Sequence, residues 1–111
     1  MPDDPYREIV SDTFTVEFLL GAEDNPDTVE NVDAILTLDD GSRRSVTVIT
    51  PDQIETIMKR WQKSGEYLNG AYFTCRDLVI VRQPGIPAIT KVLNYMVEHD
   101  RDSLERLPDA D

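Results

Sequence analysis

The chain has 111 residues, of which 40% are hydrophobic and 30% charged, and its formal net charge is −11. This length suits one domain that buries its own core. No apolar stretch approaches the ~20 residues of a membrane-spanning helix, and residues 1–5 lack the basic and apolar regions of a secretory signal. Together with the single cysteine, Cys75, these features lead us to expect a cytoplasmic protein.

The negative charge is concentrated in the first third of the chain. Residues 1–40 hold twelve acids and one base, which gives −11, whereas residues 41–111 hold ten acids and ten bases. This asymmetry argues against nucleic-acid and anionic-membrane partners, because both would be repelled. It favours a basic protein partner, whose approach electrostatic steering would accelerate. The alternative is that the acids only keep the protein soluble.

The first part of the chain predicts a flexible segment followed by a strand. Residues 1–12 are rich in proline and acids, which is typical of a loosely ordered terminus. Residues 13–20 alternate between apolar and polar over most of their length, and the apolar positions of one face are Phe14, Val16, Phe18 and Leu20. This period of two indicates a half-buried strand. Residues 22–31 show no apolar periodicity and predict an exposed acidic loop.

Residues 32–49 predict a β-hairpin around Asp39-Asp40-Gly41, and the apolar pattern indicates its register. A two-residue turn would place apolar positions opposite polar ones. A three-residue loop with Gly41 in the left-handed conformation instead gathers most apolar side chains on one face, so we choose it. The predicted pairs are Val32 with Val48, Ala34 with Val46, and Leu36 with Arg44. We expect the stem of Arg44 to lie along the rim of the sheet.

Residues 50–65 predict an amphipathic helix. Thr50 is a suitable N-cap, Pro51 suits the first helical position, and Gln53 completes a capping box. Apolar side chains then recur at spacings of three and four, and they are Ile54, Ile57, Met58 and Trp61. We expect this stripe, including Trp61, to face the core. Gly65 is the expected end of the helix.

The rest of the chain predicts a second hairpin and a final helix. Residues 72–75 and 78–81 are expected to form two strands joined by a tight turn. The continuous apolar run at 78–81 is typical of a strand buried on both faces. Residues 87–98 follow as a helix whose apolar stripe consists of Ile86, Ile89, Val92, Leu93, Met96 and Val97. Residues 101–111 predict a polar tail.

These elements predict the α+β class, with a single antiparallel sheet of about five strands, in the order β-β-β-α-β-β-α, and two amphipathic helices packed on one face. The expected domain spans residues 13–100, between a flexible acidic N-terminal segment (1–12) and a polar C-terminal tail (101–111). The sequence leaves the strand order open. If the strand at 78–81 lies at an edge, its apolar character would favour pairing with a second copy, so a homodimer is an alternative.

The chain lacks the motifs associated with catalysis and cofactor binding, including glycine-rich phosphate loops. No glycine-rich turn or third group accompanies Cys75 and His99 to make them a nucleophile and its base. The run from His99 to Asp102 falls at a helix end, which favours interaction with the helix dipole over metal binding. Residues 24–33 lack the central glycine and ligand spacing of a calcium loop. We therefore predict no catalytic, cofactor-binding or metal-binding residues, and an enzyme is the less favoured interpretation.

The candidate site is a protein-binding surface. Tyrosine and tryptophan often dominate protein interfaces, and Tyr67, which lies outside the apolar stripes and close to a turn at Asn69-Gly70, is the best candidate for an exposed anchor. The acids of the first third, which we expect on the surface, complete the site. The predicted partner-binding residues are Glu23, Asp24, Asp27, Glu30, Asp33, Asp39, Asp40 and Tyr67.

The favoured function is a small acidic protein-binding module, such as an immunity-like or inhibitor protein that neutralises a basic partner. Bacterial immunity proteins are often small, acidic and α+β, and the chain is similar in these general respects, without a motif that carries a family match. The hypothesis requires that Arg43, Arg44 and the bases of residues 59–63 do not neutralise the acids. One alternative is a small enzyme or ligand-binding domain with a cleft between sheet and helices, which convergent polar groups in a cavity would favour. Another is a homodimeric structural or accessory protein.

Overall fold

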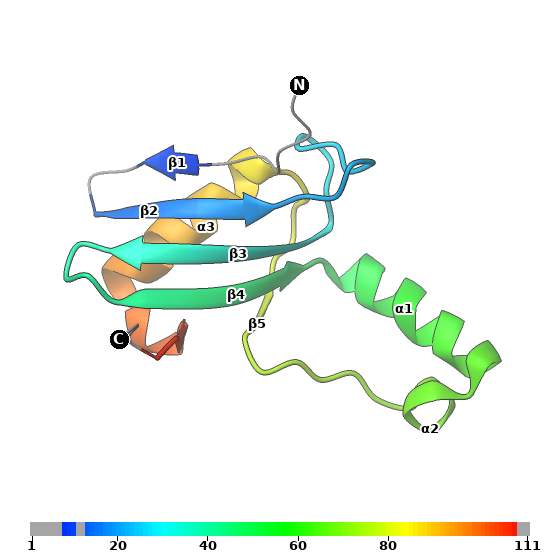
Figure 1. Ribbon diagram of the computed structural model, residues 1–111. Helices are drawn as coiled ribbons and strands as arrows, with labels where there is room; N and C mark the ends of the chain where they lie inside the picture. Colours follow the sequence, from blue (N-terminus) through cyan, green and yellow to red (C-terminus); the bar gives the residue numbers. More distant parts are fainter. Residues whose placement is uncertain (1–7, 11–12, 109–111) are drawn as a thin grey trace.

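The computed structural model describes residues 8–10 and 13–108, which form one β-sheet with helices (Figure 1). The strands are β1 (Glu8–Val10), β2 (Phe14–Leu19), β3 (Asn31–Leu38), β4 (Arg43–Ile49), β5 (Leu78–Ile80) and β6 (Glu105–Arg106). The helices are α1 (Pro51–Ser64), α2 (Glu66–Gly70) and α3 (Ile86–His99), followed by the 3₁₀ helix η1 (Arg101–Ser103). The predicted α+β class with a single sheet is confirmed.

The sheet is built mainly from antiparallel neighbours in the order β1-β2-β3-β4-β5. The β3–β4 hairpin has the predicted register, with Val32 opposite Val48 and Leu36 opposite Arg44. Gly41 has a φ of +86°, which is the left-handed conformation that the three-residue loop requires. β5 runs parallel to β4 beside its second half, and β6 pairs with the first half of β4.

The core lies between one face of the sheet and α3, which crosses behind the strands in Figure 1. Alternate residues of β2, β3 and β4 point towards the helix, as their period of two predicts. The buried apolar side chains of this core are Phe14, Val16, Phe18, Val29, Val32, Ala34, Leu36, Leu38, Val46, Val48, Val81, Ile86, Ile89, Leu93, Val97 and Leu104. The opposite face of the sheet, which we call the outward face, carries the alternate residues.

Helix α1 begins and ends where the sequence predicts. The hydroxyl of Thr50 accepts a hydrogen bond from the backbone N–H of Gln53 (3.2 Å), and Gly65 ends the helix in the left-handed conformation. The second half of the predicted capping box does not form. The N–H of Thr50 instead donates to the backbone carbonyl of Glu30 (3.0 Å), which ties the helix start to the β2–β3 loop.

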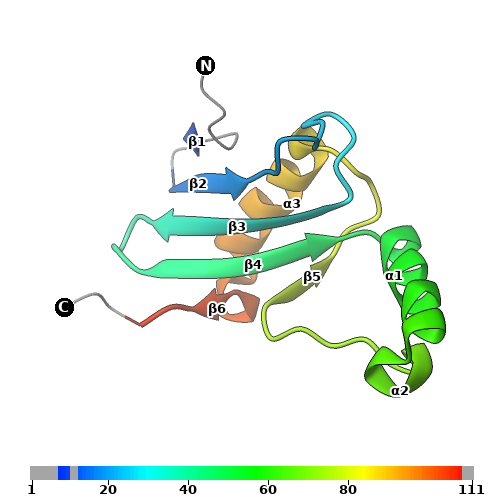
Figure 2. The same cartoon turned by 45° about the vertical axis from the view of Figure 1, so that its right-hand side comes forward.

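Residues 51–76, which comprise α1, α2 and the segment that follows, form an arm at one end of the sheet (Figures 1 and 2). The sequence predicts that the apolar stripe of α1 faces the core. This prediction is wrong, because no residue of α1 is buried. Trp61 is half-buried and packs on Tyr67 and Phe73 within the arm. Among the described helices, α3 alone supplies buried residues to the core.

α2 contains a left-handed turn. Tyr67, Leu68 and Asn69 have φ values of 51°, 57° and 59°, and each such non-glycine residue costs about 1–2 kcal/mol of backbone strain. Gly70 then closes against α1. A Cβ at this position would lie 2.3 Å from the backbone oxygen of Met58, so the turn is packed tightly against the helix.

The predicted second hairpin is wrong. Residues 72–75 form no strand, and β5 pairs with β4 rather than with them. β5 also lies at the edge of the sheet, and Ile80 is 54% exposed, so the apolar run is not buried on both faces. A short apolar run indicates burial of some of its residues, but it does not identify the neighbouring strand, which here comes from the first hairpin.

Both chain ends contribute to the sheet within the part that the structure describes. β1 pairs with β2, inside the segment predicted to be flexible, and the remaining residues of that segment, 1–7 and 11–12, lie outside the described residues. The predicted polar tail forms η1 and β6, and Leu104 is buried at 2% exposure. None of the described helices is both long and apolar enough to span a membrane.

Candidate functional site

An acidic cavity of about 290 Å³ lies where the β2–β3 loop meets the start of α1. Its lining residues are Glu23, Asp24, Asn25, Thr28, Val29, Glu30, Asn31 and Gln53. Three of the predicted partner-binding acids, Glu23, Asp24 and Glu30, therefore share one concave surface. The cavity has three carboxylates and no basic side chain in its lining, which suits a cationic group.

Local hydrogen bonds fold the loop around this cavity. The carboxylate of Asp24 accepts from the N–H of Gly21 (2.8 Å), and the side chain of Asn25 accepts from the N–H of Asp27 (2.8 Å). Both are short-range turns of the kind that Asp and Asn favour. The carboxylate of Glu30 accepts from the hydroxyl of Thr50 (2.7 Å), so the N-cap of α1 also fixes one wall of the cavity.

The start of α3 supports the same loop from the core side. The N–H of Gly85 donates to the carbonyl of Val29 (2.8 Å), and the N–H of Ile86 donates to the carbonyl of Pro26 (2.7 Å). Gly85 has a φ of +97°, and a Cβ there would lie 2.4 Å from the backbone oxygen of Asp27. Only glycine allows this close approach, so the position of the acidic loop depends on Gly85.

A pair of carboxylates, Asp33 and Asp77, lies next to the cavity on the outward face. Asn31 lines the cavity, and Asp33 is two residues further along the same face of β3, about 7 Å away. The hydroxyl of Thr47 lies 3.0 Å from Asp33 Oδ1 and 2.8 Å from Asp77 Oδ1. A hydroxyl has one proton, so it donates to one of these carboxylates at a time. The other carboxylate keeps acceptor capacity for a cationic group.

Hydrogen bonding controls the ionisation of Asp77. Burial by itself would raise the pKa of this carboxyl, but hydrogen bonds from Thr47, Cys75 and Ser45 outweigh it and hold the pKa below its usual range. The thiol of Cys75 contributes at 3.2 Å. Asp77 is therefore ionised at neutral pH beside Asp33, which adds negative charge at the base of β5.

Replacing Thr47 by valine is expected to raise the pKa of Asp77, because the donated hydrogen bond is lost and the volume is retained. The lowered pKa in the folded protein contributes stability above the unfolded value of about 4, and this contribution disappears as the pH falls through the folded pKa. Thr47→Val reduces that contribution. Carboxyl-carbon NMR titration measures the shift, and Thr37→Val, at an exposed position on the same face, is the matched control. An unchanged Asp77 titration in Thr47→Val contradicts the assignment.

The rest of the outward face mixes acids with apolar side chains. Its described strand residues are Thr15, Glu17, Leu19, Asn31, Asp33, Ile35, Thr37, Arg43, Ser45, Thr47, Ile49, Leu78, Ile80 and Glu105. This set has three acids and one base. Leu19, which pairs with Asp33, is 43% exposed. An acidic face with exposed apolar side chains suits the stems and charged ends of lysine and arginine.

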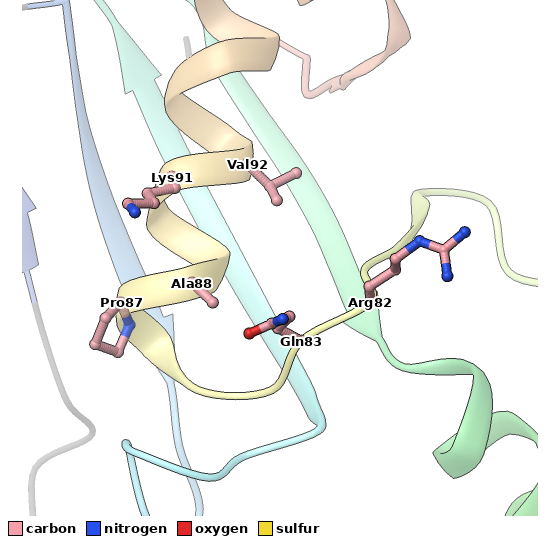
Figure 3. A pocket seen from close by; sticks show the side chains of 6 residues that line it. All are labelled: Arg82, Gln83, Pro87, Ala88, Lys91 and Val92. Atoms are coloured by element: carbon pink, nitrogen blue, oxygen red, sulfur yellow. The ribbon is translucent and has the colours of Figure 1, made fainter.

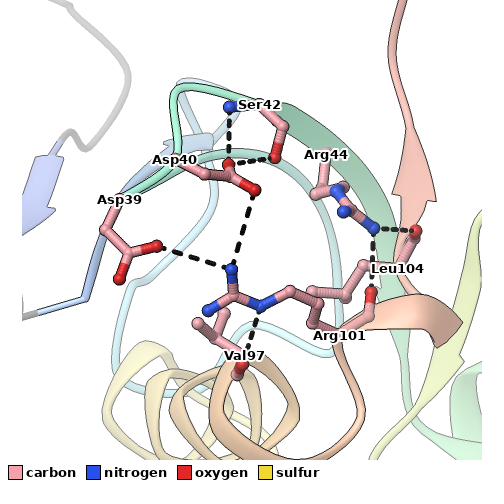
Figure 4. Close-up of polar contacts among 7 residues, drawn as sticks. All are labelled: Asp39, Asp40, Ser42, Arg44, Val97, Arg101 and Leu104. Carbon is pink, nitrogen blue, oxygen red and sulfur yellow. Dashed lines mark hydrogen bonds and ion pairs between the residues drawn. The ribbon is translucent and has the colours of Figure 1, made fainter.

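Asp39 and Asp40, which the sequence places in the same site, lie at the opposite end of β3. Seven residue steps along the strand separate the two ends by about 23 Å. Figure 4 shows the guanidinium of Arg101 reaching both carboxylates, at 3.4 Å for Asp39 and 3.8 Å for Asp40. Hydrogen bonds from Ser42 lower the pKa of Asp40, and the charge of Arg101 lowers it further. These two acids are therefore partly neutralised within the molecule.

Two of the bases that could cancel the cavity acids, Arg44 and Lys59, have partners elsewhere. Arg44 is buried, not on the rim as predicted, and its Nη1 donates to the carbonyls of Arg101 (2.9 Å) and Leu104 (3.1 Å) (Figure 4). Lys59 pairs with Glu55 on α1 (3.8 Å). Within the described residues, no base forms an ion pair with the five acids Glu23, Asp24, Asp27, Glu30 and Asp33.

Tyr67 is not part of the acidic site. It lies on the arm, where it is 46% exposed, and its ring contacts Trp61 at a centroid distance of 4.1 Å and Tyr72 at 5.6 Å. Leu68, the next residue, is 76% exposed. The eight predicted residues therefore separate into the cavity loop, the outward face, the β3–β4 turn and the arm.

A second cavity, of about 500 Å³, bears on the alternative of a ligand-binding cleft. It is lined by Arg82, Gln83, Pro87, Ala88, Lys91 and Val92, beside the first turns of α3. Figure 3 shows the amine of Lys91 and the guanidinium of Arg82 pointing in opposite directions. A small-molecule site has polar groups that converge on its ligand. The cations of Lys91 and Arg82 do not converge in this way.

The other reactive side chains have local partners. The thiol of Cys75 contacts Asp77, and the ring of His99 lies on Tyr95 at a centroid distance of 4.4 Å. His99 Nε2 is 3.9 Å from the carboxylate of Glu98. Among the residues that the structure describes, no group of three or more His, Cys, Asp or Glu side chains is arranged to hold a metal ion.

Sequence reasoning missed Asp77 and Thr47. The predicted hairpin register already placed Asp33 opposite Thr47, and this pairing is confirmed. The contribution of Asp77 depends on β5 pairing with β4, which the sequence did not indicate. Comparison with models of known families, with curated proteins and with solved structures gives no match, so the site is interpreted from its own geometry.

Proposed function

We propose that the chain is a small protein-binding module, such as an inhibitor or immunity-like protein, that receives arginine or lysine side chains of a basic partner. One observation carries the proposal: the cavity acids and the neighbouring Asp33–Asp77 pair form no ion pairs with bases among the described residues. Carboxylates that lie close together without counter-ions repel one another and lower the stability of the fold. Binding of an external cation would relieve this repulsion.

The chemistry of the surface suits a side chain that has an apolar stem and a charged end. An arginine guanidinium is planar and donates in a fixed fork, so it can bridge two carboxylates. Glu23 and Glu30 offer such a pair in the cavity, and Asp33 and Asp77 offer another on the outward face. Leu19 and Ile80, which are exposed on the outward face, provide apolar contacts for the stems.

Steering makes the proposed association fast and sensitive to salt. The chain carries a net charge of −11, and at physiological ionic strength the charges act over about 8 Å. We expect the association rate with a basic protein to fall steeply as salt is added, while the dissociation rate changes less. An association rate that does not depend on ionic strength would contradict steering by the acidic surface.

The test uses a short arginine–glycine repeat peptide with blocked ends as a defined probe, and isothermal titration calorimetry as the measurement. In the double variant Glu23→Gln/Glu30→Gln we expect binding to weaken by up to about tenfold, because each lost surface charge contact contributes about 0.2–1 kcal/mol. Glutamine retains the acceptor oxygen that Thr50 needs. NMR shifts of the wild type should change mainly at residues 21–33.

The matched control is Asp39→Asn/Asp40→Asn, which changes the net charge by the same amount at the opposite end of β3. We expect nearly wild-type binding, because Arg101 already neutralises these carboxylates in part. Equal weakening in both double variants would mean that only the total charge attracts the peptide. Wild-type binding in the Glu23→Gln/Glu30→Gln variant would mean that the cavity does not take part.

A further inference from the structure

We propose that the arm, residues 51–76, is a self-association surface whose partner is a second copy of this chain. The arm carries an exposed cluster formed by Tyr67, Leu68 and Tyr72 on an inner layer of Trp61 and Phe73. This surface is distinct from the acidic cavity and does not depend on the function proposed for it.

The exposed area of the cluster is comparable to the largest apolar patch of a typical monomer, which is often functional. Tyr67, Leu68 and Tyr72 are 46%, 76% and 50% exposed, and at ~200 Å² for each side chain they leave roughly 340 Å² uncovered. A standard interface takes about 800 Å² from each partner, so this cluster supplies about two fifths of it. The residues of the α1 stripe, which belongs to the same arm, are also partly exposed.

The backbone holds this cluster in a fixed arrangement. Tyr67, Leu68 and Asn69 occupy the left-handed region between Gly65 and Gly70, a conformation that non-glycine residues rarely adopt in succession. The turn places the ring of Tyr67 on Trp61 and leaves Leu68 outward. Strained, well-packed segments of this kind occur at sites that bind, and a preformed surface loses little entropy on association.

Charge indicates why the occupant is a second copy. The arm contains three acids (Asp52, Glu55, Glu66) and four bases (Lys59, Arg60, Lys63, Arg76), so its net charge is +1. The remainder of the chain then carries −12, since the total is −11. Two copies repel one another least through their arms, because each arm carries only +1 whereas the remainder of each copy carries −12. A basic partner, in contrast, is attracted to the acidic cavity and face rather than to the arm.

A two-fold arrangement follows from the use of one surface by both copies. Each Leu68 would pack against the aromatic cluster of the other copy, and both acidic cavities would stay free at the bases of the two arms. The dimer would therefore present two cavities for basic partners.

Sedimentation equilibrium over about a hundredfold range of concentration tests the proposal. We expect a wild-type dimer, and we expect Leu68→Glu to raise its dissociation constant at least tenfold, because a charge would be buried at the interface. Two matched controls place glutamate at other exposed apolar positions, Leu19 on the outward face and Ile80 on β5. Both should leave the dissociation constant unchanged.

The fluorescence of Trp61, the single tryptophan of the chain, gives an independent measurement. We expect its emission to shift to the blue with concentration in the wild type and to stay constant in Leu68→Glu. Leu68→Glu should keep the wild-type circular dichroism and bind the arginine–glycine peptide normally, which separates this proposal from the function of the cavity. A monomeric wild type, or dissociation by Ile80→Glu in place of Leu68→Glu, would overturn the assignment of the arm.

Discussion

Replacing Gly85 by alanine is expected to destabilise the protein by about 3–4 kcal/mol, because two separate costs coincide. The backbone of Gly85 has a φ of +97° and a ψ of 144°, a region that only glycine occupies readily. A Cβ would also lie 2.4 Å from the backbone oxygen of Asp27, so the β2–β3 loop or the start of α3 must move. Urea unfolding measures the loss of unfolding free energy.

Gly41→Ala is the matched control for Gly85→Ala. Gly41 also has a positive φ, of +86°, but nothing lies within 4 Å of the Cβ that alanine would add. It should therefore cost only the backbone strain, about 1–2 kcal/mol. Equal losses in the two variants would show that the close approach to Asp27 contributes nothing.

Gly85→Ala should also affect the acidic cavity. The N–H groups of Gly85 and Ile86 hold the carbonyls of Val29 and Pro26, so a shift of the helix start moves the loop that carries Glu23 and Asp24. We expect faster hydrogen exchange at residues 25–30 and weaker binding of the arginine–glycine peptide in a variant that is still folded. Gly41→Ala should leave both quantities unchanged.

Replacing Arg44 by alanine is expected to destabilise the protein by about 3 kcal/mol. Its side chain is 7% exposed and donates to the carbonyls of Arg101 and Leu104, so it attaches the segment after α3 to the sheet. Its loss would take the guanidinium donor from both carbonyls, of which that of Arg101 keeps only the N–H of Leu104 (3.1 Å), and would remove a large side chain from the interior. Thermal and urea unfolding measure the effect, and hydrogen exchange should rise most at residues 101–107.

Two further variants separate charge, packing and hydrogen bonding at this position. Arg43→Ala removes the same charge from the neighbouring exposed residue and should change the unfolding free energy by less than about 0.5 kcal/mol. Arg44→Met keeps most of the volume but none of the donors, so it should lie between the wild type and Arg44→Ala. If Arg44→Met has the same unfolding free energy as the wild type, the cost of burying the guanidinium equals the free energy that its hydrogen bonds contribute.

The acidic surface was predictable in its composition but only partly in its arrangement. The sequence placed Glu23, Asp24, Asp27 and Glu30 together because they are close along the chain. The sequence did not show that Asp39 and Asp40 lie far from these four acids. The two groups are at opposite ends of β3, and the extended strand holds them apart. The sequence also missed Asp77, which reaches Thr47 only because β5 pairs with β4.

Several features of this protein were predictable from short stretches of its sequence. Gly41 indicated the hairpin register, Thr50 and Pro51 indicated the start of α1, and the period of two in β2 indicated which side chains enter the core. Each depends on residues within a few positions of one another, where sterics and short-range hydrogen bonds decide the conformation.

Only the tertiary structure decided the features that join distant segments. It placed β5 parallel to β4, buried Arg44 beneath the segment after α3, and left the stripe of α1 on an arm outside the core. An amphipathic pattern records that a face is apolar, but not what covers it. Strand pairing and side-chain burial depend on contacts between segments far apart in the chain, and the free energies of those contacts are not encoded in any single segment.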